Sequence, residues 1–519
     1  MTTSSYTDPL IQCLSFAPVR PLFVLRFGTN LNRDSDQLIR RGRRTELRRL
    51  LIVSALTVSG QVQAAAQGDP VIAMVNATVV DVERGALLRD QSIVTSRGRI
   101  TYVGPAAGAR IPRGAMRIDL RGLYVIPGLW DMHVHMTGKG DPEELAKYYG
   151  TLFVAHGVTG VRDAGGDINR VRALDESGRT RPVAVPRLVY AGTKIGPGDA
   201  ASSWGIADLK AAIAERVASG ATYIKLTPEY PARLIPETRA ACAAAGVPCV
   251  AHVPAADTAM WVSQPGKGSY EHLFNLTEHV SRVPAAEVFD AVEEYEAPTL
   301  LQRVLYKLRL RRRPQEPRQL RIALRDTSKD AAFFGRLASS GTWITPTLVL
   351  HRHMTRSVDL LPSSVDPRLV LDTTVARAAD ARSDAAAMWL LWNGIVAGMS
   401  AAHVPMLAGT DFGSVHVPGA ALHAELVLLQ QAGVPTAEVL RMATLNPARY
   451  FGATDTLGSV AAGRVADLVV LTANPLDDIR HVAGIDFVMS RGRLFRRPVL
   501  DSLVNEGRLA AVRLRAVLP

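Results

Sequence analysis

Two histidines one residue apart are the first residues of this sequence whose types and spacing suggest chemistry. His133 and His135 lie in the segment WDMHVHM, directly after the apolar run GLYVIPGL, which is typical of a buried strand. Side chains two residues apart on a strand point to the same face. Both imidazoles would therefore face one side, where their nitrogens can bind zinc or another divalent metal.

Four more residues of metal-binding type lie at the ends of predicted short strands farther along the chain. They are Lys225 in YIKL, His252 in VAHV, His272 in YEHL and Asp411 in AGTD. Taken singly, each has an ordinary explanation as a core histidine, a lysine that reaches solvent or an aspartate in a turn. Buried together, they would need shared partners. Two divalent metal ions would supply them, most simply Zn²⁺, with manganese, iron or cobalt as alternatives.

Lys225 needs its own explanation, because two divalent cations would repel its ammonium group. If the amine adds carbon dioxide, the resulting carbamate has two oxygens that can bridge the metals and offset their charge. The alternative is an ion pair between Lys225 and an acid such as Glu229. The other metal-binding residues around Lys225 favour the carbamate.

The middle of the chain must position these residues, and its pattern predicts a barrel. Residues 127–451 alternate short strand-like runs with alanine-rich helical stretches, which predicts an α/β fold with a (β/α)8 TIM barrel. In such a barrel the functional side chains project from the carboxyl ends of the strands, where the six candidates fall. After the strand that leads to His133, the runs are GVTGVRDAG, PRLVYAG, TYIKL, PCVAHV, SYEHL, WITPTLVL and VPMLAGTD. We interpret residues 280–340 as a helical insertion over the barrel mouth.

The segments that flank the predicted barrel have a different residue pattern. Residues 68–126 and 452–498 contain short β-like runs broken by glycine and proline. This similarity predicts one small β-sandwich built from both ends of the mature chain. Residues 499–519 are predicted to form a C-terminal helix.

Composition and charge limit the classes of function. Of the 519 residues, 47% are hydrophobic and 21% are charged, which is typical of a globular protein. The net charge is +12, and residues 1–64, with nine Lys/Arg and four Asp/Glu, hold +5 of it. The remaining +7 is a mild excess over a long chain and does not indicate nucleic-acid binding. The basic run KLRLRRRPQEPR, residues 307–318, is interpreted as a solvated helix end, with contact to an anionic lipid or polymer as the alternative.

The N-terminal segment predicts export. Within residues 1–67, a basic stretch is followed by an apolar run and by an A-x-A-like end, the order found in a secretory signal peptide. We therefore expect a periplasmic or secreted protein without a stable membrane span after processing. Cys242 and Cys249 can form a disulfide in such a compartment, or they can be small buried apolar residues.

The ordered set of motifs resembles the amidohydrolase superfamily, in particular its secreted prolidase-like and imidazolonepropionase-like branch. The resemblance runs from about Val71 to Pro498 and includes GLYVIPGLWDMHVH, YIKL, AHV, EHL, LAGTDFG and TLNPARYFG. It implies that His133, His135 and Asp411 bind one metal. It also implies that His252 and His272 bind the other, with carboxylated Lys225 and a hydroxide bridging the two. Asp131 matches no ligand position and is interpreted as a supporting carboxylate.

The resemblance implies hydrolysis of carbon–nitrogen bonds in amides, peptides or cyclic amides of small-molecule substrates. Asp411 would take a proton from the attacking water and pass it to the leaving nitrogen. Hydrolysis of lactones, esters or organophosphates on the same site is the alternative, followed by a binding homologue without activity. Assembly of the protein into a homo-oligomer is compatible with the sequence. Predicted substrate contacts are Tyr230, His351, Arg352 and His423, with His353 and His416 as further candidates near the mouth.

Overall fold

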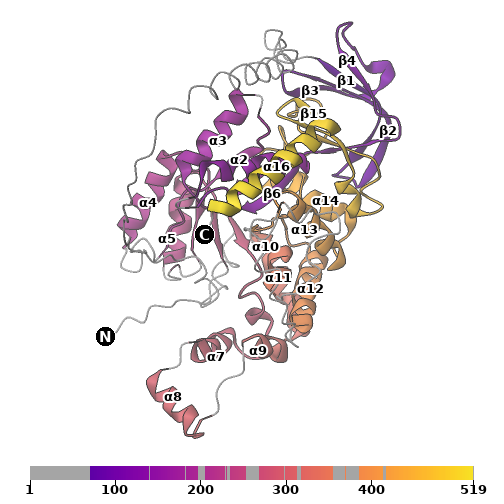
Figure 1. Ribbon diagram of the computed structural model, residues 1–519. Coiled ribbons are helices and arrows are strands. Elements are labelled where there is room, and N and C mark those ends of the chain that lie inside the picture. Colours follow the sequence, from indigo (N-terminus) through magenta and orange to yellow (C-terminus); the bar gives the residue numbers. More distant parts are fainter. Residues whose placement is uncertain are drawn as a thin grey trace, which may run out of the picture. The chain divides into compact units, whose positions relative to one another are not determined.

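A computed structural model provides the fold, and the residues it describes all belong to one compact unit, Val71–Pro519 (Figure 1). The described residues are 71–138, 141–181, 183–196, 205–227, 230, 234–252, 268–296, 299–311, 317–354, 369, 385–412 and 417–517. The predicted signal segment, Glu229 and His416 lie outside these ranges.

Strands from both ends of this unit share one mixed sheet. Its order is β15-β14-β13-β5-β1-β2-β3, and β4 pairs with β1. β5 and β13 join the two chain ends, because they pair antiparallel with Leu468 opposite Pro127. The two-layer arrangement of the predicted sandwich stays a prediction. The strands are β1 (Ile72–Asp81), β2 (Ala86–Ser96), β3 (Arg99–Pro105), β4 (Met116–Asp119), β5 (Tyr124–Pro127), β13 (Leu468–Leu471), β14 (Ile485–Ser490) and β15 (Arg493–Arg496).

A bulge in β1 keeps the apolar face of this sheet continuous. Ile72 and Met74 point into the same hydrophobic cluster as Ala77 and Val79, although the spacing changes parity between the two pairs. The register to β2 shifts between Met74 and Ala77, where Asn76 takes a φ of 58°. Asparagine tolerates this left-handed backbone, and the extra residue returns the following side chains to the buried face.

Two parallel sheets form the centre of the molecule. One has the order β6-β7-β8 and the other β12-β11-β10-β9. Most residues of these strands are buried, polar ones included, as expected for parallel strands that are covered on both faces. The strands are β6 (Leu129–Val134), β7 (Val158–Asp163), β8 (Arg187–Tyr190), β9 (Ile224–Lys225), β10 (Cys249–His252), β11 (Gly268–Glu271) and β12 (Trp343–Thr345). Helices α2 (Glu143–Ala155), α3 (Ile168–Thr180), α4 (Ile206–Ala218) and α5 (Ile235–Ala244) follow β6, β7, β8 and β9.

Backbone hydrogen bonds link the edges of these two sheets. Thr222 N donates to Tyr190 O at 2.9 Å, which connects β8 with the chain entering β9. At the other edge, the segment 404–408 lies between β12 and β6. Leu407 N donates to Ile344 O at 2.9 Å, and Met132 N donates to Ala408 O at 2.9 Å. The predicted strand in VPMLAGTD is thus reduced to an isolated bridge between Ile344 and Met406.

The predicted strand in WITPTLVL was wrong beyond Thr345. β12 ends there, and Leu348–Met354 form helix α11. The buried carboxylate of Glu425 accepts hydrogen bonds from Leu348 N at 2.9 Å and Val349 N at 2.7 Å. These two N–H groups would otherwise lack partners at the start of a helix, so Glu425 stabilises α11 from a distant part of the sequence.

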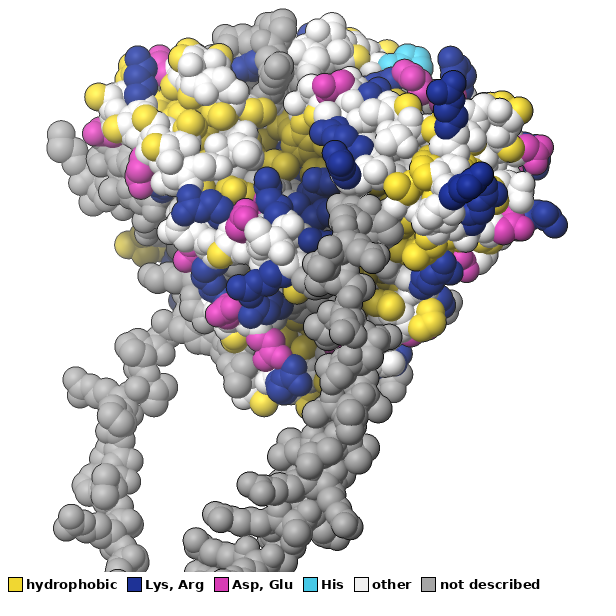
Figure 2. Space-filling view, turned by 90° about the horizontal axis from the view of Figure 1, so that it is seen from above, with side chains coloured by type: hydrophobic (Ala, Val, Ile, Leu, Met, Phe, Trp, Pro, Cys, Tyr) yellow, Lys and Arg dark blue, Asp and Glu magenta, His cyan; other side chains and the backbone are white. Residues whose placement is uncertain are grey.

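Helices form the rest of the described chain. Residues 280–340 contain α7 (Ala285–Glu296), α8 (Leu300–Lys307), α9 (Pro317–Leu324) and α10 (Asp330–Ser340). Later helices are α12 (Ala385–Ala401), α13 (Ala420–Gln431), α14 (Thr436–Met442), α15 (Leu445–Phe451) and α16 (Arg497–Val517). In the described ranges, none of the helices has the length and hydropathy needed to span a bilayer. On the face in Figure 2, lysine and arginine side chains are interspersed with acidic and hydrophobic ones.

Candidate metal centre

His133, His135 and Asp411 form a compact group of ligand-type side chains. One ligand atom from each lies within 4.8 Å of the others. His135 Nε2 is 3.0 Å from Asp411 Oδ1, and His133 Nε2 is 3.5 Å from the same oxygen. β6 carries His133 and ends at Val134, directly before His135. Asp411 N donates to His133 O at 2.8 Å, which holds the carboxylate beside this strand. The three residues could hold a metal ion.

Two more histidines extend this group. His272 Nε2 is 3.7 Å from Asp411 Oδ2, and the His272 ring centroid is 4.8 Å from that of His133. The His252 ring lies 5.0 Å from the His272 ring. His272 Nδ1 is 2.7 Å from Thr347 Oγ1, which orients its Nε2 toward Asp411. The four predicted histidines and Asp411 therefore come together, and their assignment as ligands stays a prediction.

Lys225 is buried at the end of β9, with 1% of its surface exposed. Its Nζ has no hydrogen-bond partner among the described residues, and neither does the buried Nδ1 of His252. Burial lowers the pKa of Lys225 to about 7. A buried polar atom without a partner costs roughly 1–3 kcal/mol, so these two orphaned atoms fit a site that is completed by metal ions and by modification of the amine.

A fully buried ion pair between Arg162 and Glu271 contacts His133 at its Nδ1. Glu271 accepts hydrogen bonds from His133 Nδ1, from Arg162 Nη2 at 2.7 Å and from Ser269 Oγ at 2.6 Å. Arg162 is 0% exposed, and its Nε donates to Met132 O at 2.5 Å. Burial alone would raise the pKa of Glu271, but Arg162 and His133 hold it well below its usual value.

The ionised Glu271 carboxylate fixes the tautomer of His133. Burial and the charge of Lys225 lower the pKa of His133 to about 4, so the ring is neutral near pH 7. Because Nδ1 donates its proton to Glu271, the lone pair of Nε2 faces Asp411. A carboxylate behind a histidine is a common support for metal binding. The sequence prediction missed Arg162 and Glu271, although a charged residue within the apolar run GVTGVRDAG was a visible signal.

Asp131 supports the site without joining the ligand group. Its carboxylate accepts hydrogen bonds from Thr410 Oγ1 at 2.7 Å, from Thr410 N at 3.1 Å and from His133 N at 3.2 Å. Burial raises the pKa of Asp131 to about 7. These contacts tie β6 to the segment that carries Asp411.

The predicted substrate contacts have partners inside the protein. His351 is fully buried, its Nε2 accepts from Leu273 N at 3.0 Å, and its ring lies 6.5 Å from that of His272. His423 Nε2 donates to His156 O at 2.9 Å. The guanidinium of Arg352 lies 5.0 Å from the Trp389 ring centroid, and His353 is partly buried in α11.

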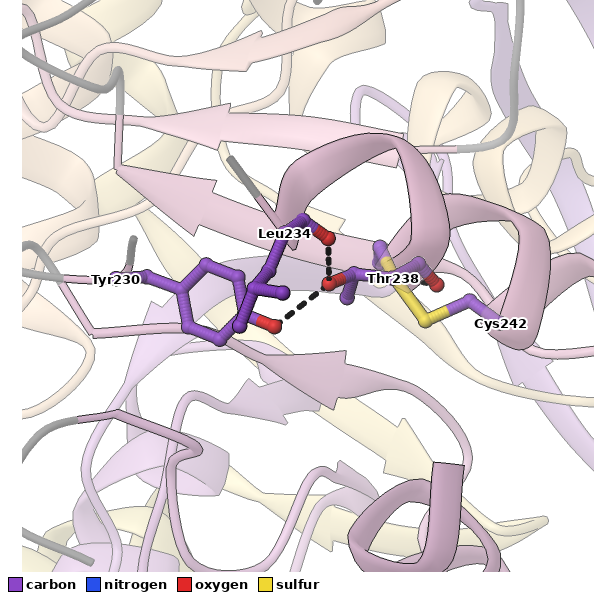
Figure 3. The surroundings of a disulfide bond; sticks show 5 residues. Tyr230, Leu234, Thr238 and Cys242 are labelled. Carbon is purple, nitrogen blue, oxygen red and sulfur yellow. Dashed lines mark hydrogen bonds between the residues drawn. A yellow bond between two sulfur atoms is a disulfide. The ribbon is translucent and has the colours of Figure 1, made fainter. Parts of the chain in front are cut away.

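Tyr230 lies next to a disulfide. Its hydroxyl is 2.7 Å from Thr238 Oγ1, which itself donates to Leu234 O at 2.6 Å (Figure 3). Cys242 in α5 is bonded to Cys249 at the start of β10. β10 ends at His252, so the disulfide fixes the strand that carries one candidate ligand.

The family model of the amidohydrolase family matches residues 124–495, and the chain belongs to this family. It is 32% identical to an imidazolonepropionase of Thermoplasma acidophilum over 94 residues, which are 18% of this chain and 23% of that protein. The chain spans about a quarter of the length of the first curated relatives that it matches.

Two solved structures share the fold over most of the chain. A bottromycin amidohydrolase has a TM-score of 0.62 at 24% identity, covering 85% of this chain and 90% of its own. A Xaa-Pro dipeptidase with methionine bound in its active site has a TM-score of 0.58 at 19% identity, covering 82% of this chain and 100% of its own. At these identities the likeness is one of fold.

Proposed function

We propose that the two central sheets and the segment 404–408 close into a (β/α)8 barrel. The hydrogen bonds from Thr222 to Tyr190 and from Met132 to Ala408 support closure at both edges. In such a barrel the candidate residues lie at the carboxyl ends of the strands, where the active sites of this fold are found. The similarity in fold to the two solved hydrolases agrees with this interpretation.

On this barrel we propose a hydrolase of carbon–nitrogen bonds in amides, peptides or cyclic amides. One observation carries the proposal: four histidines and Asp411 converge, and the buried Lys225, close enough to act electrostatically on His133 and His252, has an amine without a partner among the described residues. Membership of the amidohydrolase family supports the reaction type. The names of the imidazolonepropionase and the dipeptidase favour small cyclic amides or dipeptides as substrate classes.

The donor set fits two divalent ions, most simply Zn²⁺, because it offers nitrogen and oxygen ligands. His133, His135 and Asp411 would hold one ion, and His252 and His272 would hold the other. Lys225 would bridge them as a carbamate, and its burial favours the neutral amine that can add carbon dioxide. When bound, such ions lower the pKa of water and polarise a carbonyl group.

Asp411 is proposed to move the proton during hydrolysis. Burial alone would raise the pKa of Asp411, but His133 and His135 hold it well below its usual value, so the carboxylate is ionised near neutral pH. It can accept a proton from the attacking water and deliver it to the leaving nitrogen. His135 Nε2 lies 3.0 Å from the Asp411 carboxylate and helps to fix its orientation.

Two measurements on the purified full chain test this function. Metal analysis after loading with Zn²⁺ is expected to give about two ions per chain. A panel of dipeptides, N-acyl amino acids, cyclic amides, lactones and phosphotriesters then identifies the reaction. Turnover that is confined to lactones or phosphotriesters would contradict carbon–nitrogen hydrolysis. A chain that binds no metal and turns over no member of the panel would leave only a binding role.

The disulfide supports the further proposal that this protein works outside the cytoplasm. Cys242 and Cys249 are bonded to each other, and such bonds persist in oxidising compartments. Together with the signal-like segment at residues 1–67, this favours the periplasm or secretion. Fractionation of the native host with an antibody to the protein would test the location, and a purely cytoplasmic signal would contradict it.

A further inference from the structure

The insertion carries a concentrated group of exposed apolar side chains. Thirteen large hydrophobic side chains are exposed among the described residues, and five of them lie in the short segment 299–311. This segment consists of α8 and the residues that follow it. The five are Leu300 at 79% exposure, Leu301 at 68%, Val304 at 44%, Leu308 at 60% and Leu310 at 72%.

Local signals form α8 and attach it to its neighbour. Thr299 accepts a hydrogen bond from Gln302 N at 3.3 Å, and the Gln302 side chain accepts one from Thr299 N at 2.6 Å. This reciprocal cap starts the helix without help from other elements. On the other side, Glu294 of α7 accepts a hydrogen bond from Tyr306 and pairs with Arg311 at 2.9 Å. The helix is therefore held by its cap and by α7, while its apolar side chains stay exposed.

The spacing of four of these side chains gathers them on one side of the helix. Leu300, Val304 and Leu308 follow one another at intervals of four residues, and Leu301 lies three residues before Val304. Residues three and four apart are neighbours on a helix surface. An exposed apolar stripe of this kind marks an interaction site more often than an ordinary surface.

The charge of the same segment indicates the partner. Residues 299–311 contain four basic residues and no acidic one. The basic residues are Arg303, Lys307, Arg309 and Arg311. A second copy of the chain on this face would bring two such basic groups together, and a nucleic acid would not need large apolar side chains. Basic residues among exposed leucines on one helix are instead the pattern of a helix that lies in the headgroup region of a membrane.

We propose that α8 and the residues through Arg311 dock this protein on the surface of an anionic phospholipid bilayer. The leucines and Val304 would enter the boundary between headgroups and acyl chains, and Lys307 and Arg309 would contact the phosphates. This role is independent of the catalytic proposal, because the metal-binding candidates lie on the strands or in the segments directly after them, and the docking residues lie on the inserted helix and just beyond it. Membrane docking would also give the basic run that begins at Lys307 a role beyond that of a solvated helix end.

Vesicle sedimentation of the full chain tests the proposal. We expect binding to vesicles of phosphatidylglycerol and phosphatidylcholine, weak binding to phosphatidylcholine alone, and release at about 0.5 M salt. Leu301→Glu with Leu308→Glu should weaken the partition into anionic vesicles at least about tenfold. Lys307→Gln should weaken it about fivefold.

Leu390→Glu is the matched control, because Leu390 is 70% exposed on α12, outside the proposed surface. It should bind anionic vesicles as the wild type does. Equal binding to neutral and anionic vesicles, or full binding by the double variant, would overturn the proposal. So would light scattering that shows a dimer which the double variant converts to a monomer, because α8 would then be a contact between copies.

Discussion

Glu271 accepts a hydrogen bond from Nδ1 of His133 with one carboxylate oxygen. Its other oxygen accepts a hydrogen bond from the guanidinium of Arg162 at 2.7 Å. The first contact turns Nε2 of His133 toward Asp411, and the second keeps the carboxylate ionised in a fully buried position. The buried Arg162–Glu271 ion pair thus acts on the candidate metal site through the imidazole of His133.

Replacing Glu271 by glutamine should weaken metal binding without removing a ligand. The amide can present its nitrogen or its oxygen to His133, so the tautomer is no longer fixed, and metal affinity should fall about 10- to 100-fold. Competition with a chromogenic chelator measures this. Glu425→Gln is the control, because Glu425 is also buried but caps α11. Equal metal affinity in Glu271→Gln and the wild type would contradict the role of Glu271.

Asp411→Asn separates binding from chemistry. The amide keeps an oxygen for the metal but cannot accept a proton, so turnover should fall by about 10²- to 10⁴-fold while most of the metal remains bound. Steady-state kinetics on the substrate found with the panel, together with metal analysis of the same sample, measure both effects. Normal turnover would refute the assignment of Asp411 as proton acceptor.

Lys225→Met should have opposite effects on the metal-free and the metal-loaded protein. Methionine fills a similar volume without burying an amine that lacks a partner, so the free energy of unfolding without metal should rise by roughly 1–3 kcal/mol. The loaded protein should lose the bridging group and bind fewer ions. Urea unfolding in the presence of a chelator and metal analysis measure the two effects. A destabilised metal-free variant would show that Lys225 already has a good partner.

The pKa of Lys225 also predicts how the stability of the metal-free protein depends on pH. Burial lowers this pKa from 10.5 to about 7 in the folded state. Between these values the unfolded chain binds more protons than the folded one, so the free energy of unfolding should rise as the pH increases from 7 toward 10.5. Urea unfolding at several pH values measures the slope, which should be smaller in Lys225→Met. The same slope in both proteins would contradict the depressed pKa.

Removing the disulfide should destabilise the protein modestly. Cys242 and Cys249 are seven residues apart, so the bond closes a short loop and should contribute about 2–3 kcal/mol. The double variant Cys242→Ala, Cys249→Ala should unfold at a lower urea concentration than the oxidised wild type. Dithiothreitol should lower the midpoint of the wild type and leave that of the variant unchanged. A midpoint of the wild type that does not respond to the reductant would show that the thiols are not paired in solution.

The sequence predicted the parts of the site that depend on local pattern. His133, His135, Lys225, His252, His272 and Asp411 each fall at the end of a predicted strand, and a barrel brings such strand ends together. The partnership of Arg162 with Glu271 was not visible, because the two residues are 109 positions apart and only the packing of β7 near β11 shows it.

The helix α11 was missed for a related reason. Residues 348–350 are apolar and resemble a strand, and the residue that caps the helix, Glu425, lies in α13, far along the chain. The predicted substrate contacts were chosen by their place near the barrel mouth. His351 and His423 proved to be buried polar residues with backbone partners, which residue type and position alone do not reveal.

The pairing of β5 with β13 has a consequence for how the chain is made. β5 is translated early and stays an open edge until β13 has left the ribosome. An exposed edge of this kind invites pairing with other chains. A product truncated before Leu468 would keep the whole candidate metal site in its sequence and still be prone to aggregate.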